Sequence, residues 1–114
     1  MSDIRLKEAP YEIDGKTYIL RCNFNVLADI QEEYGDLPDI EDSQKILPNL
    51  RIYLSAMVND YADEQGWPER FTPRQIGRKI KSIDADLVST VTRLILTALY
   101  IQTSEEKEPD HSKN

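Results

Sequence analysis

Residues 11–21 read Tyr11-Glu-Ile-Asp-Gly-Lys-Thr-Tyr-Ile-Leu-Arg21, and this stretch predicts a β-hairpin. Two short runs rich in Tyr, Ile and Thr flank Asp14-Gly15, whose residues tolerate the positive φ angles of a tight type I′ turn. Side chains alternate along a strand, so Tyr18 and Leu20 should share one face. Because an isolated hairpin is marginally stable in water, one face must pack against the helices that follow.

The chain after the hairpin has the pattern of an amphipathic helix. Asn23 or Asn25 can cap its start, and Gly35 is a typical C-terminal stop. Apolar residues recur between them at helical spacing and predict the buried stripe, which comprises Phe24, Leu27, Ile30 and Tyr34. The polar, proline-containing residues 36–43 then predict a connecting loop.

Two more helices are predicted before residue 81. One should run from about 48 to 64 and stop at Gly66. Its apolar stripe comprises Leu47, Leu50, Leu54, Met57, Val58 and Tyr61. Thr72-Pro73 indicates the start of a short helix, with Thr72 as the cap and proline in the first position. Ile76 and Ile80 should share one face of this short helix.

A last helix, capped by Ser82 or Asp84, is predicted to be the centre of the core. Its apolar stripe is wider than a helix with one buried side needs. The stripe comprises Leu87, Val88, Val91, Leu94, Ile95, Ala98, Leu99 and Ile101. Since this is more apolar surface than one packed face requires, Leu94 and Leu99 are also candidate contacts to another protein.

The predicted fold is mostly α, of the α+β class, with an N-terminal β-hairpin followed by a bundle of about four helices. A chain of 114 residues has room for one core, so residues 1–103 should form a single domain. Residues 104–114 contain no aliphatic or aromatic anchor, and we expect a disordered polar tail there.

Composition excludes several classes of function. The formal net charge of −7 argues against general affinity for nucleic acid or anionic membrane, which both depend on positive charge. No apolar run approaches the roughly 20 residues that cross a bilayer, and the N-terminus does not have the pattern of a signal peptide. The single cysteine, Cys22, cannot form an internal disulfide. We therefore expect a cytoplasmic protein.

Residues 70–81 form a basic island, with five Lys or Arg and no Asp or Glu. Arg74 and Arg78 share one face of the predicted short helix, which could enter a DNA groove. Apart from Gln75, however, the island has no Asn or Gln of the kind that commonly recognises adenine. A solvated or internally paired basic face, and a docking surface for an acidic protein, are the other two interpretations.

The residue sets required for catalysis are missing. The only histidine, His111, lies in the predicted tail, where catalytic geometry cannot be held. Cys22 has no Cys or His neighbour in the sequence and should be a buried apolar residue. The carboxylate clusters fall off the apolar stripes, and no calcium-binding or glycine-rich phosphate-binding loop is present. We expect no enzyme activity, no cofactor and no metal.

Apolar side chains in the predicted connections allow two interpretations. Trp67 and Phe71 flank the turn before the short helix, and Leu37 and Ile40 lie in the first loop. Side chains this apolar are usually covered, which favours buried anchors. Aromatic residues also anchor many protein interfaces, so Trp67 and Phe71 are candidate partner contacts.

The order of these features resembles the tail assembly chaperones of long-tailed phages and prophages. In that family a hairpin with a Gly-Lys turn and an aromatic strand leads into a helix with an aromatic-Asn start, a Leu, a Glu pair and a closing Gly. The matching positions are Gly15-Lys16, Tyr18, Phe24-Asn25, Leu27, Glu32-Glu33 and Gly35. The stretches 50–57 and 71–77 are similar to the family's second helix and Thr-capped short helix. The basic residues of the short helix have no place in that pattern.

The resemblance spans most of residues 11–101 and implies a protein that binds the tape measure protein in the host cell cytoplasm before the tail tube forms. The tail tube protein and further copies of the same chain are its other expected partners. No catalytic residue is implied. The alternative hypothesis is a small regulatory DNA-binding protein that uses the basic helix within residues 70–81.

Overall fold

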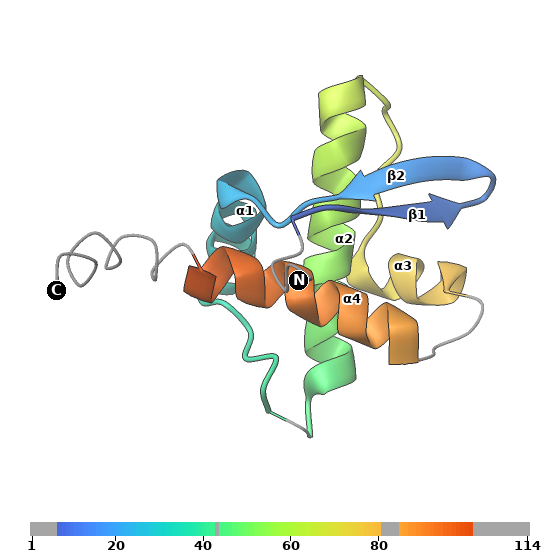
Figure 1. The fold of residues 1–114 in the computed structure, drawn as a ribbon. Coiled ribbons are helices and arrows are strands. Elements are labelled where there is room, and N and C mark those ends of the chain that lie inside the picture. Colours follow the sequence, from blue (N-terminus) through green and yellow to red (C-terminus); the bar gives the residue numbers. More distant parts are fainter. Residues whose placement is uncertain (1–6, 43, 81–84, 102–114) are drawn as a thin grey trace, which may run out of the picture.

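A computed structural model describes residues 7–42, 44–80 and 85–101, and the described chain is a hairpin followed by four helices (Figure 1). The elements are β1 (Ala9–Ile13), β2 (Lys16–Leu20), α1 (Phe24–Tyr34), α2 (Ile46–Gln65), α3 (Pro73–Lys79) and α4 (Ala85–Leu96), which a π-helical turn (Thr97–Ile101) extends. The predicted mostly helical α+β class is confirmed. The expected tail at 104–114 lies outside the described residues.

The hairpin forms as its turn residues predict. Asp14 has a φ of 52° and Gly15 a φ of 80°, the two positive values that a type I′ turn requires. The strands pair antiparallel, with Tyr11 opposite Tyr18. Tyr18 and Leu20 are each 1% exposed, whereas Thr17 faces solvent and Ile19, between the two buried residues, is half-buried. The hairpin therefore contributes one apolar face to the core, as the alternation predicted.

Helix α1 begins and ends where the sequence predicts. The Asn23 side chain accepts a hydrogen bond from the Val26 N–H at 2.9 Å, and Gly35 closes the helix with a φ of 85°. The predicted buried stripe is wrong in part, because Val26 and Ile30 face the core while Phe24 is 81% exposed. Tyr34, also in that predicted stripe, is 44% exposed.

The buried side of α1 is the side that packs on α2. Val26 and Ile30 are 0% and 2% exposed, and α1 contacts α2. At the start of the helix the Asn23 amide donates a hydrogen bond to Asp60 Oδ2 on α2 at 2.9 Å. Helical spacing alone marks which residues share a face, but it does not determine which face another element covers.

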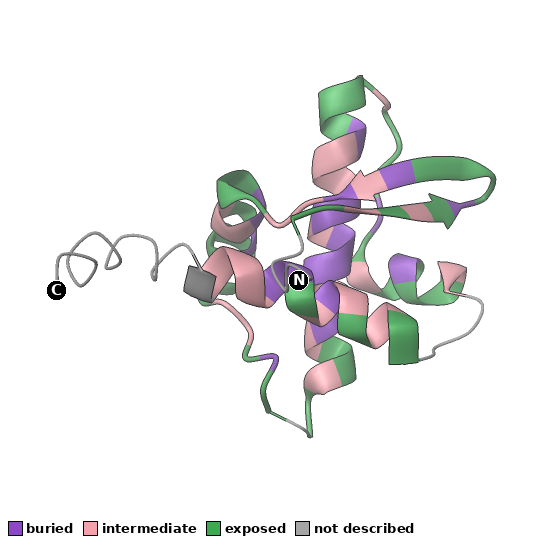
Figure 2. Ribbon diagram, in the orientation of Figure 1, coloured by how far each residue is buried: buried purple, intermediate pink, exposed green. Residues whose placement is uncertain are grey.

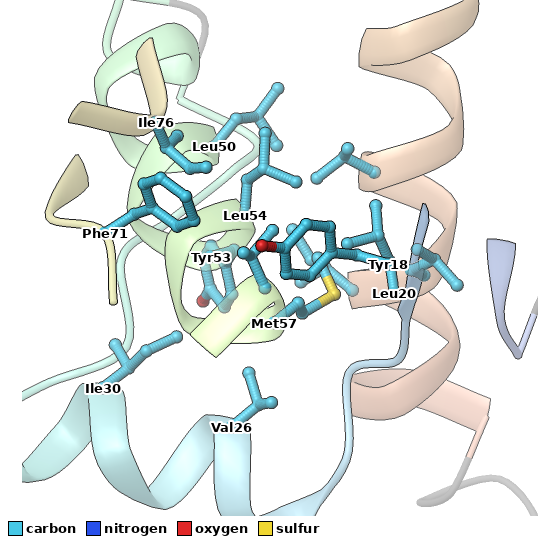
Figure 3. Close-up of a cluster of buried hydrophobic side chains, with 14 of the residues drawn as sticks. Tyr18, Leu20, Val26, Ile30, Leu50, Tyr53, Leu54, Met57, Phe71 and Ile76 are labelled. Atoms are coloured by element: carbon cyan, nitrogen blue, oxygen red, sulfur yellow. The ribbon is translucent and has the colours of Figure 1, made fainter. Parts of the chain in front are cut away.

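Helix α2 is the centre of the core, which corrects the prediction that the last helix holds this position. It packs against β2, α1, α3 and α4, and its middle turns are buried (Figure 2). Figure 3 shows its side chains among those of Tyr18, Val26 and Ile76. The buried residues of α2 are Leu50, Tyr53, Leu54, Ser55, Met57, Val58 and Ala62. In α4 only Val91, Leu94 and Ile95 are buried.

Two connections are tied to α2 by hydrogen bonds. The Tyr53 hydroxyl donates to the Pro38 carbonyl at 2.7 Å, in the loop where Ile40 is 4% exposed. The Asn59 side chain donates to the carbonyl of Phe71 and accepts from its N–H, both at 2.8 Å. These bonds satisfy backbone groups that would otherwise be buried without partners. Ile40 and Phe71 are thus buried anchors.

Helix α3 starts with a complete capping box. Thr72 Oγ1 accepts from the Gln75 N–H at 3.1 Å, and Gln75 Oε1 accepts from the Thr72 N–H at 2.9 Å. Ile76 is 0% exposed, but Ile80 lies just beyond the helix end with an extended backbone. The proposed caps of the last helix, Ser82 and Asp84, lie outside the described residues.

The core position of Leu94 leads to a first prediction. Leu94→Ala should lower the free energy of unfolding by about 2–5 kcal/mol, because it leaves a cavity where a 1% exposed side chain was. Leu47→Ala is the matched control on α2 and should cost less than about 0.5 kcal/mol, since Leu47 is 49% exposed. Urea unfolding followed by circular dichroism measures both. Equal losses for the two variants would contradict the placement of Leu94 in the core.

Candidate partner-binding groove

Three helices surround an open groove with a volume of about 410 Å³. The N-terminal half of α2 forms one wall, α3 with the residue after it forms another, and the first half of α4 forms the third. Its lining is mostly apolar and comprises Leu47, Pro48, Leu50, Arg51, Leu54, Arg74, Gly77, Arg78, Ile80, Leu87, Val88 and Val91. A volume of this size falls within the range of roughly 300–1,000 Å³ that is common for binding sites in proteins.

Helical spacing places the α2 residues of the groove side by side. Leu47, Leu50, Arg51 and Leu54 follow the i, i+3, i+4, i+7 pattern of one helix face. Leu50 and Leu54 are 7% and 3% exposed, so they form the floor. Leu47 is 49% exposed and stands at the edge, where its apolar surface meets solvent.

The α4 side has the same gradation from floor to edge. Val91 is 2% exposed, whereas Leu87 and Val88 are half-buried. On the opposite side, Ile80 is half-buried where the chain leaves α3. Gly77 adds no side chain to this wall, and a Cβ at this position would meet no atom within 4 Å. The accessible apolar surface of the groove therefore belongs to its walls, and the floor beneath them is part of the buried core.

Among the described residues, every charged side chain that lines the groove is an arginine. Arg74 and Arg78 are exposed and one turn apart on α3. Within the described residues, neither has a carboxylate within ion-pair distance. Arg51 is half-buried, and its Nε has no hydrogen-bond partner in the described parts of the chain. The groove thus joins an apolar floor to a positive edge.

The other described basic residues of the island are paired within the molecule. Arg70 Nη2 lies 3.0 Å from Asp63 Oδ1, and its Nη1 donates to two backbone carbonyls. Lys79 Nζ lies 2.6 Å from Asp14 Oδ2 in the hairpin turn, and this hydrogen bond raises the pKa of Lys79. Of the five basic residues, Lys81 lies outside the described part. The described residues of the island therefore fall into two groups. Arg70 and Lys79 are paired with carboxylates of the same molecule, and Arg74 and Arg78 line the groove.

The structure separates the six predicted partner contacts. Arg74 and Arg78 line the groove. Phe71 and Leu94 are 7% and 1% exposed, so their side chains fill the core and do not line the groove. Leu99 is half-buried and packs against the core.

Trp67 belongs to an aromatic cluster away from the groove. Its ring meets Tyr18 edge-on, with centroids 5.3 Å apart, and Tyr61 at 5.7 Å. Lys16 Nζ lies 4.5 Å from the centre of the Trp67 ring. These contacts attach the hairpin to the end of α2, and they account for the half-buried indole without a partner protein.

Sequence reasoning missed most of the apolar groove. Leu47, Leu87 and Val88 were predicted as members of core stripes, and Arg51 was not singled out. The one available signal was the excess width of the stripe on the last helix. Nothing local in the sequence shows that this excess faces the same space as Leu47 and the two arginines.

The local carboxylate clusters have structural partners or face solvent. Asp60 accepts a hydrogen bond from Asn23, and Glu64 pairs with Arg21 at 3.0 Å. A hollow of about 390 Å³ near α1 includes the exposed Asp29, Glu32 and Glu33. Within residues 7–42, 44–80 and 85–101, no three His, Cys, Asp or Glu side chains are arranged to hold a metal ion.

Comparisons with known proteins provide no relative for this fold or groove. No protein-family model, curated protein or solved structure matches the chain. In the described segments, none of the helices has the length and apolar character needed to span a bilayer.

The environment of Cys22 leads to a second prediction. Burial raises the pKa of its thiol to about 12, so almost no reactive thiolate exists near neutral pH. At pH ~8, iodoacetamide should therefore alkylate the native chain at least about a hundredfold more slowly than the guanidinium-unfolded chain, whose thiol has an ordinary pKa. Mass spectrometry of timed samples measures both rates. Similar rates in the two states would show that Cys22 is accessible and ionised.

Proposed function

We propose that this chain is a tail assembly chaperone of a long-tailed phage or prophage and binds apolar helical segments of the tape measure protein in the groove between α2, α3 and α4. Its place of action is the host cell cytoplasm, before the tail tube forms. The observation that supports a binding role most directly is the accessible apolar side of the groove, where Leu47 is 49% exposed and Leu87 and Val88 are half-buried, above the buried Leu50, Leu54 and Val91.

A groove of this kind suits a helical ligand. Amphipathic helices bind to apolar grooves by inserting side chains at i, i+3, i+4 and i+7. The face from Leu47 to Leu54 spans about 10 Å along α2, which corresponds to two turns of a bound helix. Each large apolar side chain transferred from water contributes about 1.5–3 kcal/mol, before the costs of association are subtracted. One groove therefore provides modest affinity.

Modest affinity per groove is compatible with the proposed partner. A long helical protein offers many similar segments, so several copies of the chaperone can cover it. The tail tube protein and neighbouring chaperone copies are the further partners in this proposal. The net charge of −7 on each copy favours solubility of such an assembly through mutual repulsion in solution.

DNA binding is the second candidate function, and one observation favours it. Arg74 and Arg78 are exposed on one side of α3 and have no carboxylate partner among the described residues. Arg70 and Lys79, however, are already paired with Asp63 and Asp14. Two available cations on a strongly acidic protein provide few phosphate contacts, so the chaperone role is the better supported.

Coexpression leads to a third prediction. The full chain should co-purify with the tape measure protein of the same phage or prophage, and Leu47→Asp should remove most of this binding by placing a charge at the apolar edge. Phe24→Asp is the matched control, because Phe24 is 81% exposed and lies outside the groove. Affinity pull-down with quantitative gel analysis measures the bound fraction.

Two results would contradict this prediction in different ways. Loss of binding for Phe24→Asp but not for Leu47→Asp would move the contact from the groove to α1. No complex with the tape measure protein, together with normal tails assembled without the chain, would end the chaperone proposal.

The DNA-binding alternative has its own experiment. It predicts a salt-dependent mobility shift of duplex DNA that disappears when Arg74 and Arg78 are both replaced by Ala. The chaperone proposal predicts no such shift at the same protein concentration. Circular dichroism of the double variant controls for unfolding, which is not expected because both side chains are exposed.

A further inference from the structure

We propose that the groove selects helices whose apolar stripe is flanked by carboxylates, and that Arg74 and Arg78, with Arg51 on the opposite wall, are the residues that recognise them. This inference rests on the proposed function and names the chemistry of the segments that the groove accepts. Apolar contacts alone do not distinguish helices that have the same apolar stripe but different flanking charges.

The charge distribution is the first argument. The chain has 21 Asp and Glu against 14 Lys and Arg, yet the charged residues that line the groove in the described part of the chain are all arginines. The described neighbours Arg70 and Lys79 are neutralised by carboxylates of the same molecule. The groove is therefore positively charged on an acidic protein. Among the described residues, no carboxylate forms an ion pair with Arg74 or Arg78. A ligand that supplies carboxylates complements it.

The spacing on α3 is the second argument. Arg74 and Arg78 are four residues apart, which places their Cβ atoms about 5–6 Å from each other on one helix face. Two carboxylates at i and i+4 on a bound helix have the same separation. A guanidinium can form two parallel hydrogen bonds to one carboxylate, whereas lysine acts as a point charge. Arginine at both positions thus suits paired carboxylates.

The third argument concerns the kind of anion. Leu47, Leu87 and Val88 give the groove accessible apolar surface that a sugar-phosphate backbone cannot use, because apolar surface gains nothing from phosphate contact. A helix with an apolar stripe covers this surface and at the same time presents carboxylates at the positive edge. The combination therefore favours an acidic amphipathic helix over nucleic acid.

The test compares three labelled peptides of about 20 residues, a length at which helices form on binding. All three carry the same leucine stripe at i, i+3 and i+7, and the flanking positions are Glu, Gln or Lys. Fluorescence anisotropy with the full chain should show that the Glu peptide binds about tenfold more tightly than the Gln peptide, with the Lys peptide weakest. The difference should shrink as salt is added, because the arginines are exposed.

Variants assign the preference to the groove. Replacing Arg74 and Arg78 together by Gln should lower the affinity for the Glu peptide to that for the Gln peptide, so that the roughly tenfold difference between the two disappears. Arg93→Gln is the matched control, since Arg93 is an exposed arginine on α4 that does not line the groove. It should leave all three affinities unchanged.

The outcomes separate this inference from the proposed function. Equal affinity for the Glu and Gln peptides, or a preference that survives the Arg74 and Arg78 double variant, would overturn the inference even if the tape measure protein co-purifies. Tighter binding of labelled duplex DNA than of the Glu peptide would also overturn it. Selective binding of the Glu peptide without any tape measure complex would support the inference and refute the chaperone role.

Discussion

Burial of α2 on several sides is the constraint on which the rest of the structure depends. Side chains of Tyr53, Met57 and Val58 are at most 1% exposed. Figure 3 shows Tyr53 and Met57 among side chains from the hairpin and the other helices. Because protein interiors are densely packed, each neighbouring element must fit the surface that α2 presents. The hairpin, α1, α3 and α4 are therefore positioned by one shared partner more than by one another.

The groove follows from the incomplete cover that α3 gives to this central helix. Helix α3 is seven residues long and ends at Lys79, after which Ile80 has an extended backbone. Such a short element covers part of the first turns of α2, and α4 crosses at the other side. Leu47 consequently remains half exposed although it shares a helix face with the buried Leu50 and Leu54. The same shortness places Arg74 and Arg78 beside an apolar floor.

The basic side chains are of two kinds: some form ion pairs within the molecule, and others are not paired among the described residues. Ion pairs from Lys79 to Asp14 and from Arg21 to Glu64 connect the hairpin region with α3 and the end of α2. Exposed pairs of this kind contribute little stability each, so their main effect is to satisfy the cations locally. Arg74 and Arg78 are the described members of the basic island without such a partner. A basic helix can thus form on an acidic protein, because part of its positive charge is paired within the molecule and the rest lies beside the groove.

The sequence by itself determined the boundaries that a cap or turn residue sets, because these depend on contacts within a few residues: Asp14-Gly15, Asn23, Gly66 and Thr72 act as their local chemistry predicts. It did not give the start of α2 at Ile46, which has no side-chain cap, or the end of α3 before Ile80. Only the tertiary structure decided which face of α1 is buried, which helix is central, and that apolar and arginine side chains from three helices line one groove. Such outcomes depend on burial between segments far apart in the chain. Helical periodicity marks shared faces but carries no information about what covers them.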